Sequence, residues 1–361
     1  MMEVRPRSLP ALLSVAAFRC VLVVAALCLT DMADVRGESP PDDVRGHDEI
    51  VLISSRRIGT RCDADAMLAG LDCHVYRAAS ALTSPTRSWH AAATADVLDP
   101  TRVTPTIVYI HGNRVPNGVA AGHGLSVYRS MKPRLPDDTP VRFVIWSWPS
   151  AEIRGPVRDY RVKAARTGPV AWQVAWAINQ LPADTPLAIV GYSYGARVAT
   201  GTLHLLAGGS LNGRTTPDLQ PRRSKAHAVL LAGALDADWL LPGRYHGRAL
   251  EAVDELTIIA NRRDPAMRFY HLTTDRDTRA LGYAGPAGLA SLRRAFDVEI
   301  HALDATDNVG RTHALFEYLH SSPQVARAWR LLGGLAPAST ELRQLQMATR
   351  AGGSTPPSQG G

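Results

Sequence analysis

Gly191-Tyr192-Ser193-Tyr194-Gly195 separates the apolar run Pro186–Val190 from the helix-forming stretch Ala196–Leu206. The order predicts a buried strand, a Gly-x-Ser-x-Gly turn and a helix. A sharp strand-to-helix turn crowds the residues two before and two after its serine, and glycine relieves that crowding. The serine oxygen is then exposed at the end of the strand, so Ser193 is a candidate nucleophile.

A serine hydroxyl is a poor nucleophile at neutral pH, so it needs a base, and the base needs an orienting acid. Where the serine follows a central parallel strand, the chain order is serine, acid, histidine. Asp264 follows the apolar run Leu256–Ala260 and is the predicted acid. Asp236 and Asp238, after the preceding strand, are its rivals. The structural alternative for Asp264 is a helix cap or turn before a proline.

The predicted base is His313, which lies in a polar loop between the last predicted strand and a helix. A loop position lets an imidazole reach the serine. His301 lies within that strand and His320 within the helix, so each has a structural interpretation instead.

Acyl transfer also needs backbone N–H donors aimed at the oxyanion. We predict that Tyr194, next to the serine, supplies one donor. The second is expected from His111-Gly112-Asn113, which ends the run Thr106–Ile110. Asn113 is the favoured donor and Arg114 the alternative, while a plain turn is the structural alternative because Gly-Asn is common in turns.

Several apolar runs are continuous, which is typical of parallel strands covered by helices on both faces. The chain is therefore predicted to be an α/β protein with a mostly parallel sheet of about eight strands. Cys62 and Cys73 are predicted to form a disulfide that ties the first two strands into an antiparallel hairpin. The predicted strands are Glu49–Ser54, His74–Ala78, Thr106–His111, Val141–Trp148, Leu187–Tyr192, His227–Leu231, Leu256–Asn261 and Val298–Leu303.

Apolar residues at helical spacing predict three helices between and after these strands. One carries Val170, Val174 and Ile178 and is expected to begin at Pro169, since proline suits a first helical position. The others cover Leu289–Phe296 and Gln324–Leu332.

The ends of the chain differ from its middle. Residues 1–37 combine early arginines with the short apolar core Cys20–Leu29, the layout of a secretory signal peptide. That core is too short for a comfortable membrane span, so we expect a secreted, periplasmic or cell-envelope protein. Residues 45–335 are expected to form one domain, and residues 336–361 a low-complexity, disordered tail.

Charge and metal-ligand patterns exclude some functions. The net charge of +7 is carried almost entirely by arginine, and the arginines are scattered apart from one local cluster at Arg222, Arg223 and Lys225. We therefore predict no nucleic-acid partner. CxxC and HExxH patterns are absent from the sequence, and neither a metal nor an organic cofactor is predicted.

Taken together, these motifs resemble the α/β-hydrolase fold superfamily over nearly all of the predicted mature chain. They are similar to those of a group of bacterial α/β-hydrolases of unknown function. The resemblance implies a Ser193–Asp264–His313 triad and hydrolysis of a small-molecule acyl ester through an acyl-enzyme. The alternative is a catalytically inactive binding protein of the cell envelope with the same fold. The matching stretches are His111–Arg114, Trp146–Ser150, Gly191–Gly195, Asn261–Asp264 and His313.

Overall fold

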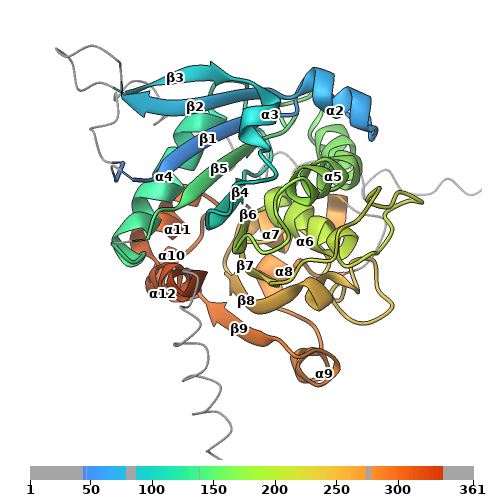
Figure 1. Cartoon of the computed structure of the whole chain (residues 1–361). Coiled ribbons are helices and arrows are strands. Elements are labelled where there is room, and N and C mark those ends of the chain that lie inside the picture. Colours follow the sequence, from blue (N-terminus) through green and yellow to red (C-terminus); the bar gives the residue numbers. More distant parts are fainter. Residues whose placement is uncertain (1–43, 46, 79–86, 138, 274–277, 336–361) are drawn as a thin grey trace, which may run out of the picture.

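The computed structural model describes residues 44–45, 47–78, 87–137, 139–273 and 278–335 of the 361-residue chain (Figure 1). The predicted signal peptide, residues 1–37, and the predicted tail, residues 336–361, lie outside the described residues. Within the described part, no helix is both long and apolar enough to span a membrane.

The described strands form one nine-stranded sheet with the order β3-β2-β1-β5-β4-β6-β7-β8-β9. The pairs β1–β2 and β2–β3 are antiparallel, and every other neighbouring pair is parallel. This confirms the predicted mostly parallel sheet and its antiparallel start. The strands are β1 Glu49–Ser54, β2 Asp72–Ala78, β3 Arg87–Ala92, β4 Thr106–Ile110, β5 Arg142–Ser147, β6 Leu187–Tyr192, β7 Ala226–Leu231, β8 Val253–Ala260 and β9 Glu299–Asp304.

Helices cover both faces of this sheet (Figure 1). The α-helices are α2 Ala64–Gly70, α3 Thr94–Val97, α4 Ala120–Met131, α5 Pro156–Asn179, α6 Tyr194–Leu206, α7 Pro265–Arg268, α8 Leu281–Ala284, α9 Leu289–Ala295, α10 Thr306–Val309, α11 Leu315–Ser321 and α12 Pro323–Leu332. The short 3₁₀ helices are η2 Lys132–Arg134, η3 Ala249–Ala252, η4 Tyr270–Thr273 and η5 Gly333–Leu335.

Two apolar clusters, one on each face, account for the continuous apolar runs. Alternate residues of β4 point to opposite faces, so Val108 packs in one cluster and Tyr109 in the other. Helices α5 and α6 complete the first cluster, and α4, α11 and α12 complete the second. Because both faces are covered, every residue of β4, β5 and β6 is buried.

Strand β3 is the ninth strand, and it was not predicted from the sequence. It lies at the edge of the sheet and pairs only with β2. An edge strand can remain partly exposed, and its sequence Arg-Ser-Trp-His-Ala-Ala has little apolar character. Its main aromatic contact is that of Trp89 with Tyr76, whose ring centroids lie 5.0 Å apart.

The predicted helix start at Pro169 is wrong. Helix α5 begins thirteen residues earlier, at Pro156, and Pro169 lies in its interior. A proline inside a helix removes one hydrogen bond and costs about 3 kcal/mol. Packing outweighs that cost, since Val170, Val174 and Ile178 are all buried against the sheet. The first half of α5 is polar, so it carries no apolar periodicity by which the sequence could reveal it.

The prediction of a Cys62–Cys73 disulfide is wrong. Both cysteines are free thiols in the structure. Their sulfur atoms have different neighbours. Sγ of Cys62 lies 3.8 Å from the carbonyl oxygen of Pro169, and Sγ of Cys73 lies 3.9 Å from Oγ1 of Thr94. The antiparallel pairing of β1 with β2 therefore rests on backbone hydrogen bonds and packing alone.

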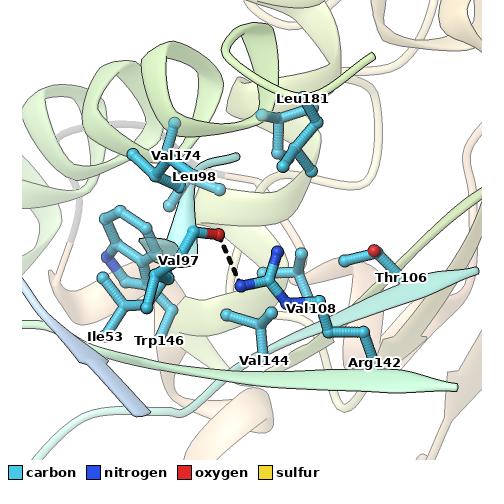
Figure 2. A pocket seen from close by; sticks show the side chains of 12 residues that line it. Ile53, Val97, Leu98, Thr106, Val108, Arg142, Val144, Trp146, Val174 and Leu181 are labelled. Atoms are coloured by element: carbon cyan, nitrogen blue, oxygen red, sulfur yellow. Dashed lines mark hydrogen bonds between the residues drawn. The ribbon is translucent and has the colours of Figure 1, made fainter. Parts of the chain in front are cut away.

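A small apolar cavity lies between α5 and the face of the sheet formed by β1, β4 and β5 (Figure 2). Its volume is about 20 Å³, room for little more than one water molecule. The buried guanidinium of Arg142 borders it and donates a hydrogen bond to the carbonyl of Val97. Neither Ser193, Asp264 and His313 nor the residues of the loop after β4 line this cavity, so it is separate from the candidate nucleophile.

Candidate active site

The turn at Ser193 is held in a backbone conformation that few non-glycine residues adopt. Ser193 has φ 55° and ψ −118°, directly between β6 and α6. Its N–H donates to the carbonyl of Leu231 at 2.9 Å, and its own carbonyl accepts from Ala234 N–H at 3.0 Å. These bonds to the last residue of β7 and to the segment after it fix the strained turn, as expected where strain serves a site.

The two glycines of the turn are required by close approach of the backbone. A Cβ atom on Gly195 would lie 1.9 Å from the carbonyl oxygen of Ile110, and one on Gly191 would lie 2.5 Å from Cα of Ala196. Both contacts are with backbone, which cannot rotate away as a side chain can. The spacing of the motif is therefore set by sterics, as predicted.

Replacing Gly195 by alanine is expected to lower the free energy of unfolding by about 3 kcal/mol, because β4 must move away from α6. Urea unfolding followed by circular dichroism measures this. Gly333→Ala is the matched control, since its Cβ would meet nothing closer than 3.5 Å and its backbone is helical. Equal stability of the two variants would contradict the steric account.

His313 links the serine to a buried carboxylate. Its Nε2 lies 3.0 Å from Oγ of Ser193, and its Nδ1 lies 2.7 Å from Oδ2 of Asp264. Asp264 is fully buried, and Ser193 is only 5 % exposed. A carboxylate can only accept, so Nδ1 carries the proton and Nε2 is left to accept the serine proton. The structure thus brings together the three residues that the sequence singled out.

Asp264 is also a helix cap, the structural alternative that the sequence offered for this residue. Its Oδ1 accepts the N–H groups of Ala266 and Met267, at 2.9 and 3.1 Å, which caps α7. Its Oδ2 accepts from His313 and from the hydroxyl of Tyr318, at 3.1 Å. One oxygen therefore fixes the carboxylate to the backbone, while the other faces the imidazole.

Three further residues hold the histidine or its acid partner in place, and none of them was predicted from the sequence to do so. The hydroxyl of Tyr192 donates to the carbonyl of His313, and the two rings stack with centroids 5.2 Å apart. Nδ2 of Asn261 donates to the carbonyl of Gly310 at 2.8 Å, which holds the loop before the histidine. Tyr318 is the third. No sequence pattern predicts this role for Tyr318, because its hydrogen bond to Asp264 depends on how α11 packs against the rest of the protein.

Replacing Tyr318 by phenylalanine is expected to lower kcat about fivefold, the equivalent of one hydrogen bond of about 1 kcal/mol. Burial and the carboxylate of Asp264 raise the pKa of Tyr318 well above its ordinary value, so its hydroxyl stays a donor. Tyr128→Phe is the control, because that hydroxyl donates to Asp48 at 2.6 Å, at the other edge of the sheet. Steady-state turnover measured on both variants should separate them, and an equal loss of kcat in both would contradict the assignment.

The loop after β4 lies against the serine. A Cβ atom on Gly112 would be 3.1 Å from Cβ of Ser193, a contact so tight that a side chain there would have to displace its neighbours by a few tenths of an ångström. Its neighbour His111 is fully buried, and the backbone N–H of Trp148 holds its ring by donating to Nε2 at 3.2 Å. Burial lowers the pKa of His111 well below its ordinary value, so this ring is neutral. Asn113 follows Gly112 in this loop, and Tyr194 follows Ser193 in the turn. The donor roles of the two residues stay predictions.

The rival acids and bases have other partners. Asp236 accepts from the hydroxyl of Tyr270 at 2.9 Å, and Asp238 pairs with Arg244. His301 lies beside Glu255 and Glu299, and Nδ1 of His320 bonds the carbonyl of Phe316 within α11. Among the described residues, no group of three or more metal-ligating side chains could hold a metal ion.

No protein-family model and no curated protein matches the sequence. Solved structures are similar at low identity. Esterase B from Lactobacillus rhamnosis, inhibited by a C6-C4 SN3 compound, has 13 % identity and a TM-score of 0.41, over 93 % of this chain and 99 % of that one. Zea mays acyl-protein thioesterase 2 has 15 % identity and a TM-score of 0.35, over 65 % and 96 %. Carboxyl esterase 2 from Tuber melanosporum has 12 % identity and a TM-score of 0.35, over 85 % and 95 %.

The fold is assigned from this chain's own topology. The parallel strands run in the order β1-β5-β4-β6-β7-β8-β9, and β6 leads through a strained serine turn into α6. The acid and the histidine follow later strands, β8 and β9. A mostly parallel sheet with a serine turn of this kind inside it gives the chain the α/β-hydrolase fold.

Proposed function

We propose that this protein is a serine hydrolase that cleaves carboxylic esters through an acyl-enzyme. The observation that carries the proposal is His313, whose two ring nitrogens lie 3.0 Å from the Ser193 hydroxyl and 2.7 Å from the Asp264 carboxylate. A fold alone does not define an activity, so the proposal rests on this geometry rather than on the fold.

In the first half-reaction, Nε2 of His313 takes the proton of Ser193 as Oγ bonds to the ester carbonyl carbon. The N–H groups of Tyr194 and Asn113 are proposed to stabilise the oxyanion, with Arg114 as the alternative to Asn113. His313 then gives its proton to the leaving alcohol as the C–O bond breaks. Asp264 stays ionised throughout and stabilises the imidazolium.

In the second half-reaction, water gives a proton to His313 and attacks the acyl-enzyme. The carboxylic acid leaves, and the proton returns from His313 to Oγ of Ser193. None of these steps uses a metal or an organic cofactor, and small acyl esters are the proposed substrates.

Covalent labelling of the wild-type protein tests the proposal. A fluorophosphonate probe should modify Ser193, as located by mass spectrometry of the digested adduct, and p-nitrophenyl esters of graded chain length should be hydrolysed. The chain length with the highest kcat/KM then defines the acyl group. A folded protein that neither reacts with the probe nor hydrolyses any ester of the series would instead be the inactive binding protein of this fold.

A further inference from the structure

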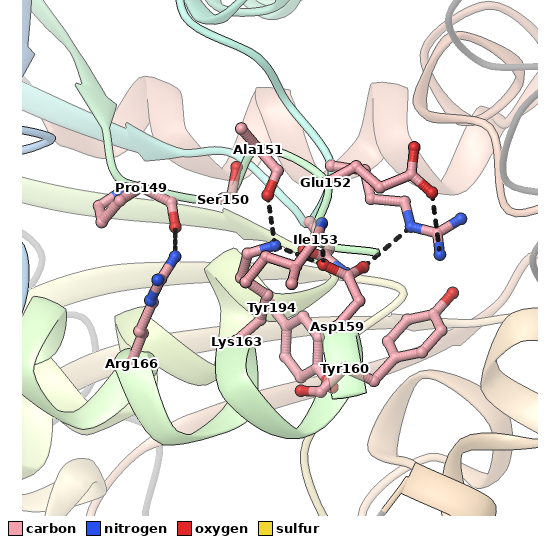
Figure 3. Close-up of polar contacts among 12 residues, drawn as sticks. Pro149, Ser150, Ala151, Glu152, Ile153, Asp159, Tyr160, Lys163, Arg166 and Tyr194 are labelled. Carbon is pink, nitrogen blue, oxygen red and sulfur yellow. Dashed lines mark hydrogen bonds and ion pairs between the residues drawn. The ribbon is translucent and has the colours of Figure 1, made fainter. Parts of the chain in front are cut away.

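A fully buried carboxylate lies in the first turn of α5, close to the loop that follows β4 (Figure 3). Asp159 is 0 % exposed. Its Oδ1 accepts from Nζ of Lys163 at 2.6 Å and from Ile153 N–H at 2.9 Å. Its Oδ2 accepts from Nε of Arg114 at 3.0 Å and Nδ2 of Asn113 at 3.3 Å. One side chain therefore joins α5 to two consecutive residues of the predicted oxyanion loop.

The carboxylate stays ionised in this setting. Burial alone would raise the pKa of Asp159, but hydrogen bonds from Lys163 and Arg114 outweigh it and hold that pKa below its ordinary value. Lys163 is also fully buried, and its Nζ donates to the carbonyl of Ala151 at 2.6 Å. The pair thus binds the segment after β5 as well as the loop after β4.

The loop needs such support, because its backbone is not in a relaxed conformation. Arg114 has φ 56°, in the left-handed region that is unfavourable for residues other than glycine. Two residues earlier, Gly112 is in close contact with the serine turn. A small change in the backbone at Asn113 would therefore alter the position of an N–H group relative to Ser193.

The neighbouring residue of α5 contacts the second predicted donor. The rings of Tyr160 and Tyr194 have centroids 6.4 Å apart, and the hydroxyl of Tyr194 donates to the carbonyl of Tyr160 at 3.3 Å. The guanidinium of Arg114 lies over the ring of Tyr160, 5.4 Å from its centroid. Asp159 and Tyr160 together thus touch both residues whose N–H groups are proposed to bind the oxyanion.

A purely stabilising role accounts poorly for this arrangement. Taking a carboxylate and an ammonium out of water is costly. A protein in which apolar residues of similar volume replace such a buried pair is often at least as stable. A charged group held at this place is better suited to fixing geometry, because charge-assisted hydrogen bonds are short and directional.

We propose that Asp159 is a positioning residue, which holds the Asn113–Arg114 backbone so that the oxyanion donor is correctly placed beside Ser193. The inference rests on the proposed function. Asp159 touches no reacting atom and acts through the loop, so its effect should appear in the transition state rather than in substrate binding.

Asp159→Asn is expected to lower kcat about 10- to 100-fold, since small misplacements of catalytic groups have effects of this size. KM should change by less than about threefold, because the oxyanion donor that the substitution displaces is used only in the transition state. The rate of fluorophosphonate labelling should fall in parallel, since the phosphoryl oxygen uses the same donors. Both rates are measured on the full chain.

Asp48→Asn is the matched control. The side chain of Asp48 is also fully buried and accepts from an arginine, from the hydroxyl of Tyr128 at 2.6 Å and from Val141 N–H at 2.9 Å. It precedes β1, at the opposite edge of the sheet from Ser193. We expect this variant to lose thermal stability while keeping its kcat. Equal losses of kcat in the two variants, or no loss in Asp159→Asn, would overturn the positioning role.

A milder variant covers the case in which Asp159→Asn does not fold. Asn113→Ala removes the Nδ2 contact with Asp159 but keeps the backbone N–H, and it should lower kcat severalfold with KM unchanged. A wild-type kcat in this variant would then overturn the proposal. Failure of the proposed function gives a different result, namely a wild-type protein that is itself inactive and unlabelled.

Discussion

Replacing Ser193 by alanine is expected to lower kcat for ester hydrolysis by about 10⁶-fold and to abolish fluorophosphonate labelling. The variant lacks the only atom proposed to bond to the acyl carbon, and His313 then has no serine proton to accept. The fold should persist, because alanine fills the same turn and the backbone bonds to Leu231 and Ala234 do not involve Oγ. Initial rates and in-gel fluorescence measure the two losses.

Ser130→Ala is the control for this experiment. Ser130 lies on α4, where its Oγ donates to the carbonyl of Leu319 at 3.4 Å, away from the serine turn. This variant should retain labelling and kcat. If Ser193→Ala were still labelled at the wild-type rate while folded, another nucleophile would be responsible and the proposed mechanism would be wrong.

Replacing Asp264 by asparagine is expected to lower kcat by about 10⁴-fold, an effect of tautomer rather than of position. The N–H groups of Ala266 and Met267 both point at Oδ1, so the asparagine oxygen must occupy that place. Its NH₂ group then faces Nδ1 of His313, where Oδ2 was. Nδ1 must become an acceptor, which leaves the ring proton on Nε2, facing Ser193 and unable to accept from it.

The stability of this variant should change little, because asparagine caps helices about as well as aspartate. Asp236→Asn is its control, since that buried carboxylate bonds Tyr270 and was the rival acid in the sequence. Chemical denaturation and steady-state kinetics on both variants give the comparison. A larger loss of kcat in Asp236→Asn than in Asp264→Asn would reverse the assignment of the acid.

Much of the fold could be predicted because apolar periodicity is a local property. The runs that became β4, β5 and β6 are continuous, and burial on both faces follows from that pattern. The order of Ser193, Asp264 and His313 along the chain likewise matches the order of the strands that carry them. Strand β3 could not be predicted from apolar periodicity, because an edge strand needs little apolar surface. The start of α5 could not be predicted either, because the first half of that helix is polar.

The sequence by itself determined the strained serine turn, since the glycines at 191 and 195 are dictated by backbone contact. It also indicated that Asp264 and His313 follow the ends of later strands than Ser193 does. Tertiary structure alone decided that Tyr318 supports Asp264, that Cys62 and Cys73 stay apart, and that Asp159 reaches the loop at Asn113. Asp159 and Asn113 are 46 residues apart in the chain. Contacts of this kind depend on how helices pack against the sheet, and that packing leaves no periodic trace in the local sequence.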